Sequence, residues 1–263
     1  MHPLQTQAIG FSFTNAYALV QAASIAYQNA AAIESQAIAW NFPKMKFLDS
    51  GTTQGYLMAN EQAIVIAFRG TEGKNRKDWL TNLNFDRIPT DQGDIHEGFS
   101  RAVDRIWQDL WLNLLKFRTA QQPIFITGHS LGGALATLTA FRLVSAGQAV
   151  HALYTFGSPR VGDRTYRQHF DVALGDRTFR IVNDEDVVAK VPFKAMGYCH
   201  VGAKYRFDSQ GKLWTTPISQ NFLDRLQDEV EDLVDPDWEL IEDHSLSAYR
   251  DRILMNLFPA SVA

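Results

Sequence analysis

Residues 126–134 of the chain read Ile126-Thr127-Gly128-His129-Ser130-Leu131-Gly132-Gly133-Ala134. An apolar, strand-forming run precedes the serine, and a helical pattern follows it. In that context the Gly-x-Ser-x-Gly pattern predicts a nucleophile elbow, a sharp turn that presents a serine at the end of a strand. Glycines two positions before and after the serine remove Cβ atoms that would collide in the turn. The stretch therefore predicts a catalytic Ser130 between a strand and a helix.

Strand-forming and helical segments alternate on both sides of this turn. The predicted strands are 55–59, 62–68, 123–127, 152–156 and 178–182, and the predicted helices between them are 100–116 and 131–146. The nearly continuous apolar run at 62–68 indicates a strand buried on both faces. Such alternation predicts an α/β fold with a mostly parallel sheet flanked by helices. At the two ends of the chain we expect a helix from a Thr14 cap through Asn29, a hairpin over 204–216, and two further helical segments.

Composition excludes several classes of function. The chain has 263 residues, 25 Lys and Arg against 29 Asp and Glu, and a net charge of −4, which disfavours nucleic-acid binding. Its single cysteine, Cys199, cannot form an intramolecular disulfide, and the histidines lack metal-binding spacing. No phosphate-binding glycine motif is present, so we expect no cofactor and no metal. No linker or repeat divides residues 1–263, so one domain is expected.

The N-terminal region was considered as a targeting or membrane segment. The first basic residue is Lys44, so the positively charged start of a secretory signal is missing. Residues 8–27 are apolar on average, but polar side chains interrupt them too often for a membrane span. We expect a cytoplasmic protein, or one exported by a route that the sequence does not show. Oligomeric state is not indicated.

A serine hydroxyl needs a histidine base that an acid holds in place, and on this fold the order along the chain is serine, acid, histidine. The candidate acids follow the strand at 178–182 and are Asp184, Glu185 and Asp186. Asp186 is favoured, because the apolar pair after it can anchor its backbone.

Four histidines follow the serine: His151, His169, His200 and His244. The first two precede every candidate acid, so His200 and His244 both remain open as the base. His129 is next to the nucleophile, where a side chain points away from the site, and His96 lies in a short His-Glu-Gly-Phe run. Both are interpreted as structural histidines.

Several blocks together resemble one family, the class 3, fungal-type triacylglycerol lipases, which have the α/β-hydrolase fold. The family also includes phospholipases A1, galactolipases and feruloyl esterases. The blocks lie in the family's order along the chain: Ala67-Phe68-Arg69-Gly70-Thr71, Asp78-Trp79-Leu80 with Phe85, His96-Glu97-Gly98-Phe99, the run from Gly128 to Ala136, the run from Tyr154 to Gly162, Asp186-Val187-Val188, and Asp243-His244 with Tyr249.

The resemblance implies roles for particular residues. Ser130 corresponds to the nucleophile, Asp186 to the triad acid and His244 to the base, while His200 falls where the family has a non-catalytic histidine. An elbow of this kind predicts that the backbone N–H of Leu131 stabilises the oxyanion. The resemblance assigns the second donor to Thr71. Two departures stand out: a lone cysteine where secreted fungal members have disulfides, which fits an intracellular or bacterial-type member better, and a proline that comes only at Pro192 after the Asp186 run.

The implied function is that of a serine carboxylic-ester hydrolase, most simply a lipase acting on acylglycerols at a lipid–water interface through an acyl-enzyme on Ser130. A phospholipase A1 or galactolipase and a feruloyl-type esterase are alternatives within the same chemistry. A catalytically silent, lipase-like binding protein is the alternative from another class.

The resemblance also implies a helical lid over residues 72–88. Trp79, Leu80 and Leu83 form a short apolar stripe there, beside a polar and locally basic face. We therefore expect these three side chains to contact lipid or substrate. Without the resemblance, the same pattern indicates a surface helix that packs its stripe on the core.

Substitution Trp79→Ser tests the lid. A lid exposes its apolar stripe to a lipid surface when it opens, so the change should reduce hydrolysis of emulsified triglyceride much more than that of a dissolved short-chain ester. Rates on both substrates are measured side by side. Equal losses, or none, would mean that the segment is scaffold.

Overall fold

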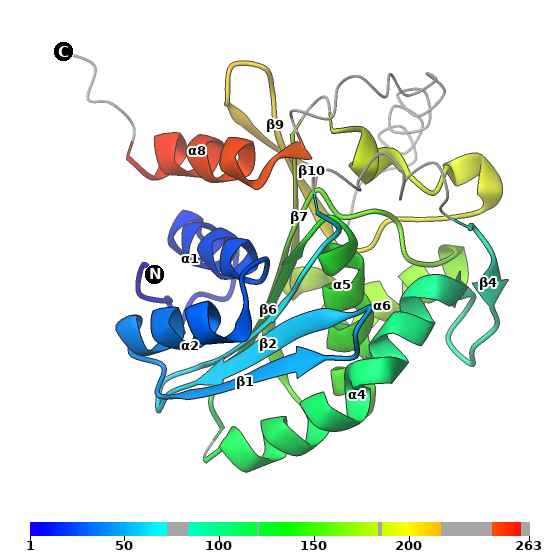
Figure 1. Cartoon of the computed structure of the whole chain (residues 1–263). Coiled ribbons are helices and arrows are strands. Elements are labelled where there is room, and N and C mark those ends of the chain that lie inside the picture. The colour runs from blue at the N-terminus through cyan, green and yellow to red at the C-terminus, as the bar shows by residue number, and fades with distance from the viewer. Residues whose placement is uncertain (73–83, 120, 184–185, 217–243, 259–263) are drawn as a thin grey trace.

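The computed structural model describes residues 1–72, 84–119, 121–183, 186–216 and 244–258. The expected lid stripe, the acids Asp184 and Glu185, and the whole segment between the hairpin and His244 lie outside these residues. In the described part, one sheet has the strand order β1-β2-β3-β6-β7-β8-β9-β10 (Figure 1). Its strands are β1 Lys44–Asp49, β2 Gln54–Ala59, β3 Ile64–Phe68, β6 Ile124–His129, β7 Val150–Phe156, β8 Thr178–Asn183, β9 Ala203–Phe207 and β10 Leu213–Thr216.

The remaining described elements are helices and one short strand pair. The α-helices are α1 Phe13–Ile25, α2 Ala30–Ala39, α4 Glu97–Phe117, α5 Leu131–Ser145, α6 Arg164–Leu174 and α8 Leu246–Leu257. Short 3₁₀ turns are η2 Gly175–Arg177, η3 Val187–Lys190 and η4 Lys194–Met196. Strands β4 Arg87–Ile88 and β5 Ile95–His96 pair with each other, antiparallel, away from the main sheet.

The centre of the sheet is parallel and its edges are antiparallel. Strands β3, β6, β7, β8 and β9 run in the same direction, whereas β1 and β2 at one edge and β10 at the other run against their neighbours. The carboxyl ends of parallel strands meet at one edge of a sheet, where ligand sites of open α/β folds form. Ser130 directly follows β6, so it lies at that edge.

Helices cover both faces of the sheet, as Figure 1 shows. Along β3, the side chains of Ile64, Ile66 and Phe68 pack in a core with α4, α5 and α6. Those of Val65 and Ala67 pack in a second core with α1, α2 and α8. All five residues of β3 are buried. The predicted α/β fold, with a mostly parallel sheet flanked by helices, is confirmed.

The predicted N-terminal helix is wrong at both ends. Ser12, not Thr14, caps α1, because its Oγ accepts a hydrogen bond from the backbone N–H of Asn15 at 3.2 Å. The helix ends at Ile25 rather than Asn29. The Asn29 side chain accepts from the N–H of Ala32 at 2.9 Å and so begins a second helix, α2. Sequence reasoning had no element for α2, β1 or α6.

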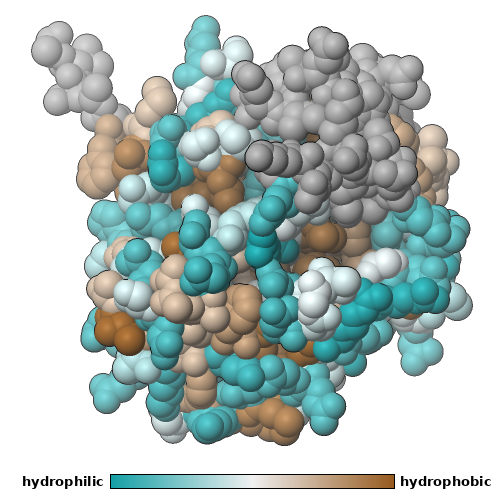
Figure 2. All heavy atoms as spheres, viewed as in Figure 1, coloured by the Kyte–Doolittle hydropathy of each residue, from teal (hydrophilic) through white to brown (hydrophobic). Residues whose placement is uncertain are grey.

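No helix in the described ranges is both long enough and apolar enough to cross a bilayer. On the face that Figure 2 shows, hydrophilic and hydrophobic residues are interspersed among the described part of the chain.

His96 joins the strand pair to α4. Its ring is 2% exposed, stacks on Phe99 with centroids 3.7 Å apart, and caps the helix by accepting from the Phe99 N–H through Nδ1 at 3.3 Å. Burial disfavours the charged imidazolium and lowers the pKa of His96 to about 4. His96 is therefore a neutral, structural histidine at pH 7.

This buried histidine makes stability depend on pH. Between pH 6.5 and about 4 the unfolded state binds a proton at His96 that the folded state does not, so the stabilisation present above pH 6.5 is lost as the pH falls. The loss is about 2 to 3 kcal/mol. Asn can keep the cap without titrating, so His96→Asn should flatten the pH dependence of the unfolding free energy, measured by urea denaturation across this range. An unchanged slope would show that the ring ionises freely in the folded protein.

Candidate active site

The turn between β6 and α5 holds Ser130 in a strained conformation. Its φ is 59° and its ψ is −134°, a region that costs a non-glycine residue about 1 to 3 kcal/mol. The Ser130 N–H donates to the carbonyl of Phe156 at 3.0 Å, which ties the turn to the end of β7. A Cβ on Gly128 would lie 2.1 Å from the Gly132 carbonyl oxygen, and one on Gly132 would lie 2.3 Å from that of Phe68. Only glycine fits at these two positions, so this is the geometry of a nucleophile elbow.

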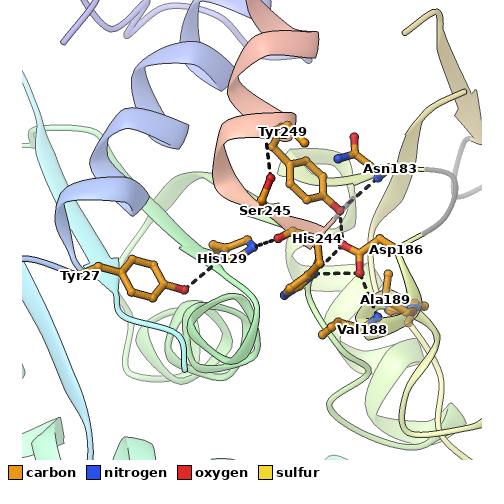
Figure 3. Close-up of polar contacts among 11 residues, drawn as sticks. Tyr27, His129, Asn183, Asp186, Val188, Ala189, His244, Ser245 and Tyr249 are labelled. Carbon is orange, nitrogen blue, oxygen red and sulfur yellow. Dashed lines mark hydrogen bonds and ion pairs between the residues drawn. The ribbon is translucent and has the colours of Figure 1, made fainter. Parts of the chain in front are cut away.

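Asp186 and His244 form a fully buried pair, 58 residues apart in sequence (Figure 3). The Nδ1 atom of His244 lies 2.8 and 2.7 Å from the two carboxylate oxygens of Asp186. Burial by itself would raise the pKa of Asp186, but the charge of His244 and the hydrogen bonds that the carboxylate accepts lower it below its ordinary value. An ionised carboxylate only accepts hydrogen bonds, so Nδ1 of His244 carries the proton. Its Nε2 is then the basic atom.

Two further donors hold the Asp186 carboxylate. The N–H of Val188, in η3, donates to Oδ1 at 2.9 Å, and Val188 packs in a small buried cluster with Val187 and Val191. The hydroxyl of Tyr249, on α8, donates to Oδ2 through a short contact. Burial and the nearby Asp186 charge raise the pKa of Tyr249, so this hydroxyl keeps its proton. Tyr249 in turn accepts from the Asn183 N–H at 3.1 Å.

Ser130 and His244 both lie next to the end of β7. Ser130 is bonded to Phe156, and a Cβ on the next residue, Gly157, would lie 2.7 Å from Nδ1 of His244. Both Oγ of Ser130 and Nε2 of His244 are buried without a hydrogen-bond partner among the described residues. A nucleophile and a base that are both unengaged can pair when a substrate enters, because catalytic hydrogen bonds often tighten only in the complex. The structure thus brings two of the predicted triad residues, Asp186 and His244, into contact and places them beside the end of β7, to which the Ser130 turn is bonded.

The two predicted oxyanion donors line one cavity of about 730 Å³ beside the elbow. Thr71 and Leu131 are both half-buried there, next to Gly70. Leu131 is the first residue of α5, and the first N–H groups of a helix have no acceptor within it. The remaining wall is partly polar and partly apolar, and it comes from the turn before β2, from the region around β4, and from the first turns of α4.

The two other histidines near the site have backbone partners. His200 is half-buried, and its Nε2 lies 2.7 Å from the carbonyl oxygen of Ala189 in η3. Loss of contact with water lowers the pKa of His200 well below its ordinary value. His129 lies between the Tyr27 hydroxyl and the backbone of His244 (Figure 3). Sequence reasoning gave His129 only a general structural role and placed Tyr27 on the packing face of a helix. It did not connect the two, since no local pattern shows a contact over 102 residues. No group of metal-ligating side chains occurs in the part of the chain that the structure covers.

Comparison with known proteins places this geometry in a family. The model of the family described as Lipase (class 3) matches residues 65–196, half of the chain. The chain belongs to the class 3 lipase family. The matched range of this class 3 lipase includes the elbow and Asp186, whereas His244 lies beyond it.

Individual relatives agree with that assignment. The lipase of Rhizomucor miehei is 33% identical over 156 residues, which cover 56% of this chain and 42% of that protein. Phospholipase A1-II 4 of Oryza sativa subsp. japonica is 29% identical over 198 residues, covering 63% of this chain and 48% of that protein. The structure of lipase II from Rhizopus niveus superposes with a TM-score of 0.62 at 26% identity and covers 74% of this chain and 78% of that one. This chain spans about half the length of the two curated relatives.

The substitution Tyr249→Phe tests the hydrogen bond to Asp186. Hydrogen bonds to charged groups contribute about 1.5 to 3 kcal/mol, so the variant should lose roughly that much stability and about tenfold in kcat on a soluble ester. Tyr166→Phe is the matched control, because Tyr166 is also buried but its hydroxyl has no partner among the described residues. That control should keep its kcat. Equal kcat in the two variants would remove Tyr249 from the support of the triad.

Proposed function

We propose that this class 3 lipase hydrolyses carboxylic esters of acylglycerols through an acyl-enzyme on Ser130. The observation that supports it best is the buried Asp186–His244 pair at 2.7 Å, placed at the same edge of the sheet as a strained serine. A buried carboxylate and imidazole are costly to maintain, and here their arrangement leaves one basic nitrogen free. That is the arrangement a serine nucleophile needs.

Acylation follows from these atoms. Nε2 of His244 takes the proton from Ser130 Oγ as the oxygen bonds to the ester carbonyl carbon. The carbonyl oxygen becomes an oxyanion, which the N–H groups of Leu131 and Thr71 stabilise; one such donor contributes about 3 to 4 kcal/mol. The intermediate then breaks its bond to the alcohol oxygen, which receives the proton from His244. Asp186 stabilises the imidazolium throughout.

Deacylation repeats the sequence with water. His244 takes a proton from a water molecule, whose oxygen bonds to the acyl carbon, and the bond to Ser130 Oγ breaks. The serine recovers its proton and the carboxylic acid leaves. None of these steps requires a metal or an organic cofactor.

A phospholipase A1 or galactolipase is the second candidate, and the charged side chains in the cavity wall favour it. Arg69 and Arg101 in its wall form ion pairs with Glu72 and Glu97. Arg105 donates instead to the Thr52 hydroxyl at 2.9 Å and has no carboxylate within ion-pair distance among the described residues. Its guanidinium is therefore available for the phosphate or sugar of a polar-headed lipid. A lipid–water interface is the expected place of action in either case.

Two measurements test the proposal. A fluorophosphonate probe should label the wild-type protein and not Ser130→Ala, whereas a silent binding protein would not be labelled at all. Initial rates are then compared on short and long p-nitrophenyl esters, triolein, phosphatidylcholine, a galactolipid and methyl ferulate. Preference for triolein supports a triglyceride lipase, and preference for methyl ferulate contradicts an acylglycerol substrate.

The variant Arg105→Gln separates the two lipid classes. If the cavity receives a polar head group, the variant should lose about tenfold on phosphatidylcholine and little on triolein, because one charge-assisted hydrogen bond contributes about 1.5 kcal/mol or more. A uniform change on both substrates would show that Arg105 does not contact the head group.

A further inference from the structure

Two residues outside the triad connect the catalytic segments beneath the elbow. The Tyr27 hydroxyl lies 2.8 Å from Nδ1 of His129, and Nε2 of His129 lies 2.7 Å from the backbone carbonyl oxygen of His244. The rings of His129 and His244 also pack against each other, with centroids 4.5 Å apart. Figure 3 shows the series running from Tyr27 through His129 to His244 and on to Asp186.

The chemistry of the partners fixes the direction of these bonds. A carbonyl oxygen only accepts, so Nε2 of His129 carries the hydrogen and donates it to His244. In the neutral ring Nδ1 is then an acceptor, and the Tyr27 hydroxyl donates to it. His129 is fully buried, so both of its ring nitrogens form their hydrogen bonds out of contact with bulk water. Losing either bond would leave a buried polar atom without a partner.

Tyr27 also contacts the loop that carries the oxyanion donor. A Cβ built on Gly70 would lie 2.4 Å from the Tyr27 hydroxyl and 3.1 Å from Cβ of Ser130. The guanidinium of Arg69 lies over the Tyr27 ring, 5.9 Å from its centroid. Tyr27 thus lies against the residues that immediately precede Thr71. One side chain borders the oxyanion loop and, through His129, the backbone of the base.

The Asp186 contact holds only the imidazole of His244, at the tip of its side chain. The backbone of His244 precedes α8, and the bond from His129 fixes it against the end of β6. With both ends held, the imidazole can neither slide along Asp186 nor turn away from Ser130. A displacement of about 1 Å in a catalytic group can cost about a hundredfold in rate.

We propose that Tyr27 and His129 are positioning residues, which set the backbone of His244 and the oxyanion loop in register with Ser130. This inference rests on the proposed function, because it assumes that His244 is the base. His129, the residue before the nucleophile, then contributes to catalysis indirectly, by holding the backbone of His244 in place.

The experiment measures the rate constant of fluorophosphonate labelling, and kcat and KM on a soluble p-nitrophenyl ester, in folded protein. His129→Met keeps the volume but removes both hydrogen bonds, and should lower the labelling rate and kcat about a hundredfold with KM nearly unchanged. His129→Gln can donate to His244 and accept from Tyr27, so it should recover most of that loss. Tyr27→Phe should give an intermediate loss of about three- to tenfold.

The matched control is His151→Met. His151 also places Nε2 against a backbone carbonyl, that of Ala8 at 3.0 Å, but far from the elbow along the chain. It should label at the wild-type rate. If the folded His129→Met or Tyr27→Phe variant reacts with the fluorophosphonate probe at the wild-type rate, the inference is overturned. If His129→Met does not fold, Tyr27→Phe decides alone, and a wild-type protein that does not label at all contradicts the proposed function instead.

Discussion

The contact between the Asp186 carboxylate and His244 is the interaction on which the rest of the site depends. A carboxylate that is fully buried stays charged only if hydrogen bonds and an opposite charge replace the water it has lost. Here the replacements come from the histidine, from the N–H of Val188 and from Tyr249. Removing any one of them leaves charge uncompensated in a region of low dielectric. The turn η3, the end of β8 and the start of α8 are all held by this requirement.

The parallel sheet explains why these parts can meet. Strands β6, β7 and β8 are neighbours and point the same way, so the residues after them lie at one edge of the sheet. Ser130 follows β6, Gly157 follows β7, and Asp186 comes soon after β8. The base is the exception, because it belongs to no strand end. His244 reaches this edge just before α8, where the packing of that helix and the bond from His129 hold it.

The cavity beside this elbow is the part of the site on which the two proposed lipid classes differ. Its wall combines the two expected oxyanion donors with arginines, carboxylates and amides, rather than with apolar side chains alone. A polar lipid head group binds well only where the cavity wall offers hydrogen-bond partners, whereas an acyl chain needs none. Arg105 in this wall is the side chain that we propose contacts a polar head group.

The elbow, the alternation of strands with helices, and the order in which serine, acid and histidine follow one another could all be predicted from the amino-acid sequence, because they depend on local patterns. The sequence could not choose between His200 and His244 without the family resemblance, and it misplaced the first helix cap, since several polar residues near Ser12 can cap equally well. Strand β1, which was not predicted, is an edge strand with charged residues, so its hydrophobic pattern is weak. Only the tertiary structure decided that Tyr249 donates to Asp186 and that Tyr27 reaches His244 through His129. Those contacts join residues from 63 to 115 positions apart, and no local rule of sequence specifies which distant side chains will face each other once the sheet has formed.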